Sequence, residues 1–191
     1  MEGINLQKGQ RVPIEKNGVS IQKFRIGLGW DTNETDSGLD FDLDASAFIL
    51  GENNKVVSQS HFVYFNNLKD PENSVIHTGD NLTGEGEGDD EMIDVDLSLI
   101  NQSAKSISIV VTIHDATARN QNFGQVRNAF VRIYDPNSNE EIMKYDLSED
   151  FSIETAIEFG RIYLHNDKWK FEAIGSGYSG GLQSFVDNYI G

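Results

Sequence analysis

The amino-acid sequence predicts an all-β protein, built as a two-sheet β-sandwich with a short C-terminal helix. Segments rich in β-branched and aromatic residues recur along the 191 residues, and clusters of Gly, Asn, Asp and Ser separate them. Helical periodicity is confined to the last residues of the chain. No linker rich in Pro, Gly and Ser divides the sequence, so we expect residues 1–191 to form a single domain.

The expected strands are short and end at turn-forming residues. In the first half of the chain they cover residues 12–14, 20–28, 41–50 and 61–65. In the second half they cover residues 92–97, 106–114, 128–134, 141–146, 157–165 and 169–174. The last two strands are joined by Asn166, Asp167 and Lys168, which predicts a β-hairpin.

Only the tail is predicted to be helical, over residues 181–190. Its apolar residues recur at the i, i+3, i+4 and i+7 positions of one helix face, and they are Leu182, Phe185, Val186 and Tyr189. Ser179 stands where an N-cap is expected. The glycines that precede this helix are expected to form the turn that docks it, and they are Gly175, Gly177 and Gly180.

Negative charge is concentrated in two segments of a chain whose net charge is −16. Residues 26–54 contain seven acids and residues 70–104 contain ten, and neither segment has a Lys or Arg. The segments would repel one another if they met without cations, so we expect them to share bound cations. The same acidity argues against direct binding to nucleic acid or to an anionic membrane.

The strongest candidate for a cation site is the glycine-rich segment of residues 79–91. From Asp80 to Glu91 it has six carboxylates, three glycines and no Lys or Arg. Glycines allow the backbone to curl so that carbonyl oxygens point inward. Oxygen ligands without sulfur or imidazole favour Ca²⁺ over Zn²⁺ or Cu²⁺. A solvated acidic loop is the alternative, and Glu85 at the position that needs Gly excludes an EF-hand.

Other oxygen-bearing residues are candidates for the same site. Asp42 and Asp44 alternate with apolar residues, so a strand places them together on one face, which either faces solvent or lines the cation site. Asn66 and Asn67 follow an apolar strand, where they either form an ordinary turn or offer amide oxygens to calcium. His77, just before the glycine-rich segment, is a candidate supporting residue.

An enzyme is the alternative class of function. A metal-dependent hydrolase would use the same acids to hold an ion with one open position. His114 next to Asp115 resembles a general base with its orienting acid, but adjacent strand residues are expected to point to opposite faces. Cysteine is absent, which excludes disulfides and thiolate chemistry. With no signal-like N-terminus and no long apolar run, we expect a soluble, cytoplasmic protein without membrane insertion.

Motifs spread along nearly the whole chain resemble the TerD family of tellurite-resistance and general stress proteins. They include Gly27-Leu28-Gly29-Trp30-Asp31, Asp40-Phe41-Asp42-Leu43-Asp44, Tyr64-Phe65-Asn66-Asn67, His77-Thr78-Gly79-Asp80-Asn81, Gly88-Asp89-Asp90-Glu91 and Ile113-His114-Asp115-Ala116. The resemblance implies a β-sandwich that binds calcium through acidic loops and acts in tellurite and stress resistance. We expect a non-enzymatic binding module that holds more than one Ca²⁺ ion. It also implies partners among other Ter proteins, including an integral membrane protein.

The resemblance further implies a set of calcium-binding residues. Glu87 is left out, because we expect Asp there in many relatives. The implied metal ligands are Asp42, Asp44, Asn66, Asn67, Asp80, Asn81, Thr83, Gly84, Glu85, Gly86, Asp89, Asp90 and Glu91.

Overall fold

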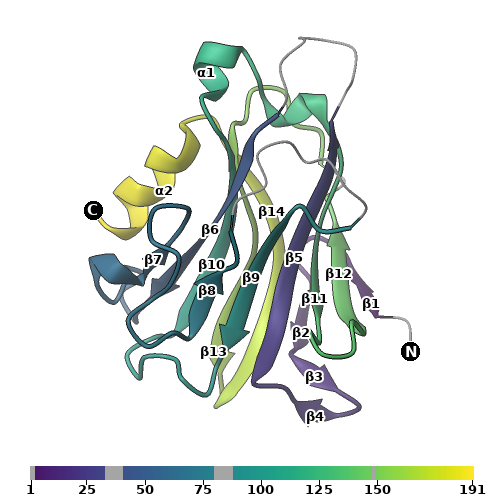
Figure 1. Ribbon diagram of the computed structural model, residues 1–191, viewed down its shortest axis with the longest axis vertical. Coiled ribbons are helices and arrows are strands. Elements are labelled where there is room, and N and C mark those ends of the chain that lie inside the picture. Colours follow the sequence, from purple (N-terminus) through teal and green to yellow (C-terminus); the bar gives the residue numbers. More distant parts are fainter. Residues whose placement is uncertain (1–2, 33–40, 80–87, 148) are drawn as a thin grey trace.

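The computed structural model describes residues 3–32, 41–79, 88–147 and 149–191, and it confirms the predicted two-sheet sandwich (Figure 1). Sheet A has the strand order β1 (Ile4–Leu6), β12 (Glu141–Asp146), β11 (Val126–Tyr134), β5 (Lys23–Thr32), β9 (Glu91–Asp96) and β8 (Val75–His77). Sheet B has the order β2 (Arg11–Pro13), β14 (Lys168–Tyr178), β13 (Ala156–His165), β10 (Ser106–Ile113), β6 (Leu43–Leu50) and β7 (Phe62–Val63). A small hairpin joins β3 (Glu15–Lys16) to β4 (Val19–Ser20).

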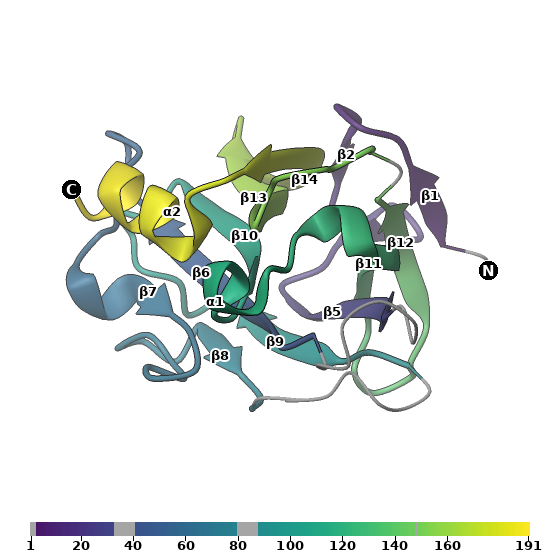
Figure 2. The same cartoon turned by 90° about the horizontal axis from the view of Figure 1, so that it is seen from above.

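The hydrophobic core lies between the two sheets and follows from strand alternation. On β9 every second residue is buried, and Ile93 and Val95 face the core while Met92 and Asp94 face outward. In contrast, β6 and β10 are buried along their whole length. The reason is α2 (Gly181–Tyr189), which packs Phe185 and Tyr189 on the outer face of sheet B. Seen from above, α2 lies beside β6 and β10 (Figure 2).

The C-terminal helix is confirmed, but its predicted cap is wrong. The N-cap is Gly180, and the carbonyl of Ser179 instead accepts a hydrogen bond from the hydroxyl of Thr155. Three single-turn helices were not predicted, because one turn is too short to show apolar periodicity. They are η1 (Gln59–His61), α1 (Ala116–Arg119) and η2 (Phe123–Gln125).

The strands at the C-terminal end also differ in part from the prediction. The hairpin between β13 and β14 is confirmed, with Asn166 and Asp167 at φ values of 50° and 59° as a tight two-residue turn requires. However, β14 continues through Gly175 and Gly177 to Tyr178, so these two glycines do not form a turn. The short strands β1, β3, β4 and β8 were missed, since two or three residues carry little pattern.

The strand ends bring the acidic segments to one end of the sandwich. The pair Leu28–Glu91 places the start of β9 beside the second half of β5, and the pair Leu43–Ile113 places the start of β6 beside the end of β10. These strand ends lie in the upper half of Figure 1, and β6 contacts β9. Among the described helices, none is long and apolar enough to cross a membrane.

Candidate functional site

The predicted metal ligands fall into a described and an undescribed set. Asp80, Asn81, Thr83, Gly84, Glu85 and Gly86 lie outside the described residues. The other predicted ligands lie at the start of β6, at the start of β9 and in the turn after β7. We call the first two places, with Asp42, Asp44, Asp89, Asp90 and Glu91, the acidic end of the sandwich.

Asp44 lies in β6, and Asp42 comes directly before the first residue of that strand. Asp44 is only 7% exposed, so the solvated-face interpretation is wrong for this carboxylate. Its Oδ2 lies 3.7 Å from Nδ1 of His114. The backbone N–H of His114 donates to the carbonyl of Asp42 at 2.8 Å. The carboxylate of Asp44 and the ring of His114 therefore meet where β10 ends and β6 begins.

Asp89, just before β9, folds back over the outer face of sheet A. Its carboxylate lies over Gly27, where a Cβ would stand only 2.3 Å from Cγ of Asp89. There it accepts two hydrogen bonds from Arg132 of β11, at 2.7 Å from Nε and 2.9 Å from Nη2. This bidentate pair compensates the charge of Asp89 from within the protein.

Asp90 is buried without such a partner. The residue is 8% exposed, and its Oδ2 accepts a hydrogen bond from the backbone N–H of Trp30 at 2.9 Å. The backbone N–H of Asp90 donates a hydrogen bond to the carbonyl of Leu28. Within the described ranges, no Lys, Arg or His forms an ion pair with it. Burial raises the pKa of the Asp90 carboxyl to about 6, and the negative charges of Asp89, Asp31 and Glu91 add to the shift. A cation bound to this carboxylate would offset the free-energy cost of burying its negative charge.

Glu91 is fully buried and faces His77 across the edge of sheet A. Its Oε2 lies 2.8 Å from Nε2 of His77. The N–H of Gly79 donates to Nδ1 of the same ring at 3.1 Å. Since Nδ1 accepts the N–H of Gly79, Nε2 is the ring atom that carries the proton, and it lies against the carboxylate of Glu91. His77 therefore orients this carboxylate, as a supporting residue would.

The Asn66–Asn67 turn belongs to a different part of the molecule. The side-chain amide of Asn67 donates to the carbonyls of Phe62 and Ser60 at 2.7 and 3.2 Å. Asn67 also lines a groove with Leu182 and Val186 of α2, on the outer side of sheet B. The structure thus gives Asn67 a role in closing its own turn, while Asn66 is exposed.

His114 and Asp115 lie closer together than strand geometry suggests. The strand β10 ends at Ile113, and Asp115 adopts a left-handed conformation with φ of 51°. Nε2 of His114 consequently lies 3.4 Å from Oδ2 of Asp115. The expectation that the two side chains point to opposite faces is wrong, because it assumed a strand that does not continue this far.

The strand order defines a two-sheet β-sandwich, and the comparisons with known proteins agree with this fold. A solved homologue of telluride resistance protein (TerD) from Streptomyces coelicolor A3(2) matches this fold with a TM-score of 0.68 and 19% identity, over 87% of this chain and 96% of its own. The TerD domain family matches residues 2–189.

Two curated relatives are much closer in sequence. General stress protein 16U of Bacillus subtilis is 55% identical over 97% of this chain and 96% of its own length. Tellurium resistance protein TerD of Serratia marcescens is 50% identical over the same share of each chain. The chain belongs to the TerD family, as its motifs indicated.

Proposed function

We propose that this protein is a non-enzymatic calcium-binding module that acts in tellurium resistance and the stress response. Its membership of the TerD family, with relatives named for these two roles, supports the biological part. The chemical part rests on Asp90, a carboxylate buried at the acidic end with a raised pKa. A divalent cation would compensate the negative charge of this buried carboxylate.

The residues at the acidic end fit a hard cation. In this proposal carboxylates from both sheets would contribute oxygen atoms, with Asp42 and Asp44 at the start of β6 and Asp90 before β9. Asp89 and Glu91 are held by Arg132 and His77, so they fix the backbone on either side of Asp90. Calcium accepts such mixed carboxylate and carbonyl oxygens in flexible arrangements. The predicted ligands Asp80, Asn81, Thr83, Gly84, Glu85 and Gly86 would complete the coordination of more than one ion.

Binding of calcium would stabilise the fold by linkage. An ion that binds only the folded state adds about 2.7 kcal/mol at a hundredfold excess over its Kd. We therefore expect a melting temperature that rises with Ca²⁺ and falls with chelator. Calorimetric titration with Ca²⁺ and Mg²⁺ tests the site directly, because Mg²⁺ demands stricter octahedral geometry. A melting temperature that changes with neither Ca²⁺ nor chelator would refute the proposal.

Two variants locate the site. Asp44→Asn and Asp90→Asn should each remove most of the calcium-induced rise in melting temperature. The control is Glu158→Gln, which neutralises an equally buried acid paired with Arg161 on β13. This control should lower the melting temperature in chelator but keep the calcium-induced rise. An undiminished rise in the two Asp variants would place the ion elsewhere.

The proposal includes a place of action and partners. We propose that the module acts in the cytoplasm with other Ter proteins, including an integral membrane one. Calcium at the acidic end would complete the surface that these partners contact. Co-purification of a tagged chain with the other Ter proteins, compared in Ca²⁺ and in chelator, tests this part.

One observation favours a second function, a metal-dependent hydrolase. His114 lies between the carboxylates of Asp44 and Asp115, so a base stands beside the candidate metal ligands. Hydrolysis of phosphate or carboxylate esters that requires both a divalent ion and His114 would establish it. Activity unchanged in His114→Ala would exclude this mechanism.

A further inference from the structure

A second group of side chains that can bind a metal ion lies near the contact between the edge strands β7 and β8, away from the candidate calcium ligands of β6 and β9. His61 ends η1 and precedes β7, the edge strand of sheet B. Asp70 and Glu72 lie in the turn that precedes β8, the edge strand of sheet A. The group therefore stands where the chain passes from the edge of one sheet to the edge of the other.

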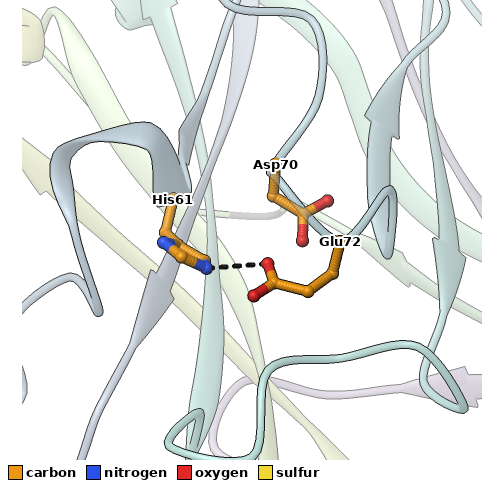
Figure 3. A group of neighbouring side chains, drawn as sticks. All are labelled: His61, Asp70 and Glu72. Atoms are coloured by element: carbon orange, nitrogen blue, oxygen red, sulfur yellow. Dashed lines mark hydrogen bonds and ion pairs between the residues drawn. The ribbon is translucent and has the colours of Figure 1, made fainter.

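The three side chains converge on a common point (Figure 3). Nε2 of His61 lies 2.9 Å from Oε2 of Glu72, and one ligand atom from each residue lies within 4.8 Å of the other two. Ligands of a tetrahedral Zn²⁺ ion lie roughly 3.3 Å apart, from bond lengths of about 2.0–2.1 Å. A small inward shift of the carboxylates would therefore close the site on an ion.

Each of the three side chains is held from outside the group. The hydroxyl of Ser58 lies 2.7 Å from Nδ1 of His61, which directs Nε2 toward the centre. The amide of Asn101 donates to Oε1 of Glu72 at 2.6 Å and leaves Oε2 facing His61. Outer partners of this kind orient the ligands of natural metal sites.

Asp70 is the most firmly fixed member of the group. Its Oδ2 accepts the hydroxyl of Ser74 at 2.7 Å, and its Oδ1 accepts the N–H of Val75 at 2.8 Å. Each carboxylate oxygen has two lone pairs, so one remains on each atom for a metal ion. Asp70 is 1% exposed and His61 is 4% exposed, so the site is shielded from water on most sides.

We propose that His61, Asp70 and Glu72 form a second metal site, which binds a divalent transition-metal ion such as Zn²⁺. One imidazole and two carboxylates match the donor preferences of Zn²⁺ and give two negative charges for a doubly charged ion. Calcium would be disfavoured, because it prefers six to eight oxygen ligands. The partly exposed side of Glu72 leaves the fourth position to water. The bound ion would join the edges of the two sheets.

The test is calorimetric titration of the full chain with Zn²⁺ in excess Ca²⁺, which keeps the acidic end saturated. We expect one Zn²⁺ site, and Co²⁺ in its place should give visible absorption bands of a low-symmetry nitrogen and oxygen site. Glu72→Gln and Asp70→Asn should each weaken Zn²⁺ binding by roughly 10–100-fold or more. His61→Asn should abolish binding, and circular dichroism checks that it folds.

The matched control is Glu140→Gln. The side chain of Glu140 is 33% exposed and paired with Lys16, and that of Glu72 is 29% exposed and paired with His61. Zn²⁺ binding should be unchanged in this control. The proposal is overturned if wild type binds no Zn²⁺, or if Glu72→Gln and Asp70→Asn bind it as wild type does. Either result would mean that His61 and Glu72 form an ordinary ion pair. Calcium titrations of Glu72→Gln should match wild type, so the two proposals fail separately.

Discussion

Gly27 of β5 and Asp89 lie so close together that a Cβ on Gly27 would stand 2.3 Å from Cγ of Asp89. This approach lets Asp89 reach Arg132 on the next strand, because Gly27 and Arg132 are paired across β5 and β11. A glycine in the middle of a strand ordinarily weakens it. Here it makes room for a carboxylate that fixes the segment leading into Asp90.

We predict that Gly27→Ala displaces Asp89 and breaks its pair with Arg132. Breaking a buried pair leaves an uncompensated charge, so the free energy of unfolding should fall by about 3 kcal/mol. Urea denaturation measures this loss, and calcium affinity should fall with it. The control is Gly51→Ala, whose Cβ would meet its nearest neighbour at an ordinary 3.5 Å. Equal effects of the two substitutions would contradict the role given to Gly27.

The second prediction concerns Asp90 and pH in the presence of chelator. The pKa of its carboxyl is about 6 in the folded protein against an ordinary value of 3.8. The folded state therefore holds the proton more tightly, and this contribution to stability is complete below pH 3.8 and is lost as the pH rises through about 6. Wild type should lose stability relative to Asp90→Asn across this range. Asp90→Asn should be the more stable protein at neutral pH in chelator.

Calcium should reverse this order. The ion stabilises the ionised carboxylate, so wild type should become the more stable protein at neutral pH and the pKa of Asp90 should fall. Urea denaturation with and without Ca²⁺ measures the first effect, and carboxyl NMR of Asp90 measures the second. Asp187→Asn, at an exposed position of α2, should show neither. A pKa of Asp90 that does not move with Ca²⁺ would separate this residue from the ion.

The third prediction concerns the helix that closes sheet B. Phe185 is buried between Tyr178, at a ring distance of 4.7 Å, and Phe48 and Tyr189, at 6.3 and 6.0 Å. Phe185→Ala should lower the free energy of unfolding by about 3–5 kcal/mol through lost burial and a cavity. Gln183→Ala, at an exposed position of the same helix, should change it by less than about 0.5 kcal/mol. Thermal or urea denaturation compares them, and similar losses would mean that α2 is not docked through Phe185.

The sequence was sufficient to predict the long strands and the C-terminal helix, since their periodic patterns extend over many residues. It also predicted a strand that carries Asp44, because alternation along a strand is a local property. The elements that were missed are those of one turn or two to three residues, such as α1 and β8. Their conformation depends on neighbours distant in the sequence.

The charge pattern was informative only in part, for a related reason. Counting charges along the chain shows acidic segments without Lys or Arg, but strand pairing brings in bases from elsewhere. Arg25 of β5 pairs with Asp94, and Arg132 of β11 pairs with Asp89. Likewise, no spacing in the sequence connects His61 with Asp70 and Glu72, which meet only because the edges of the two sheets lie together.

The last prediction concerns His77, whose Nε2 lies 2.8 Å from Oε2 of the buried Glu91. His77→Leu removes the imidazole that lies against a carboxylate inside the core, so we expect a loss of about 3–5 kcal/mol in the free energy of unfolding. His77→Gln keeps an N–H donor and should lose much less. His165→Leu, on the exposed hairpin end, is the control for the change in polarity. Urea denaturation in Ca²⁺ and in chelator compares all three variants. If Leu and Gln at position 77 cost the same, the polar contact with Glu91 is not what His77 contributes to stability.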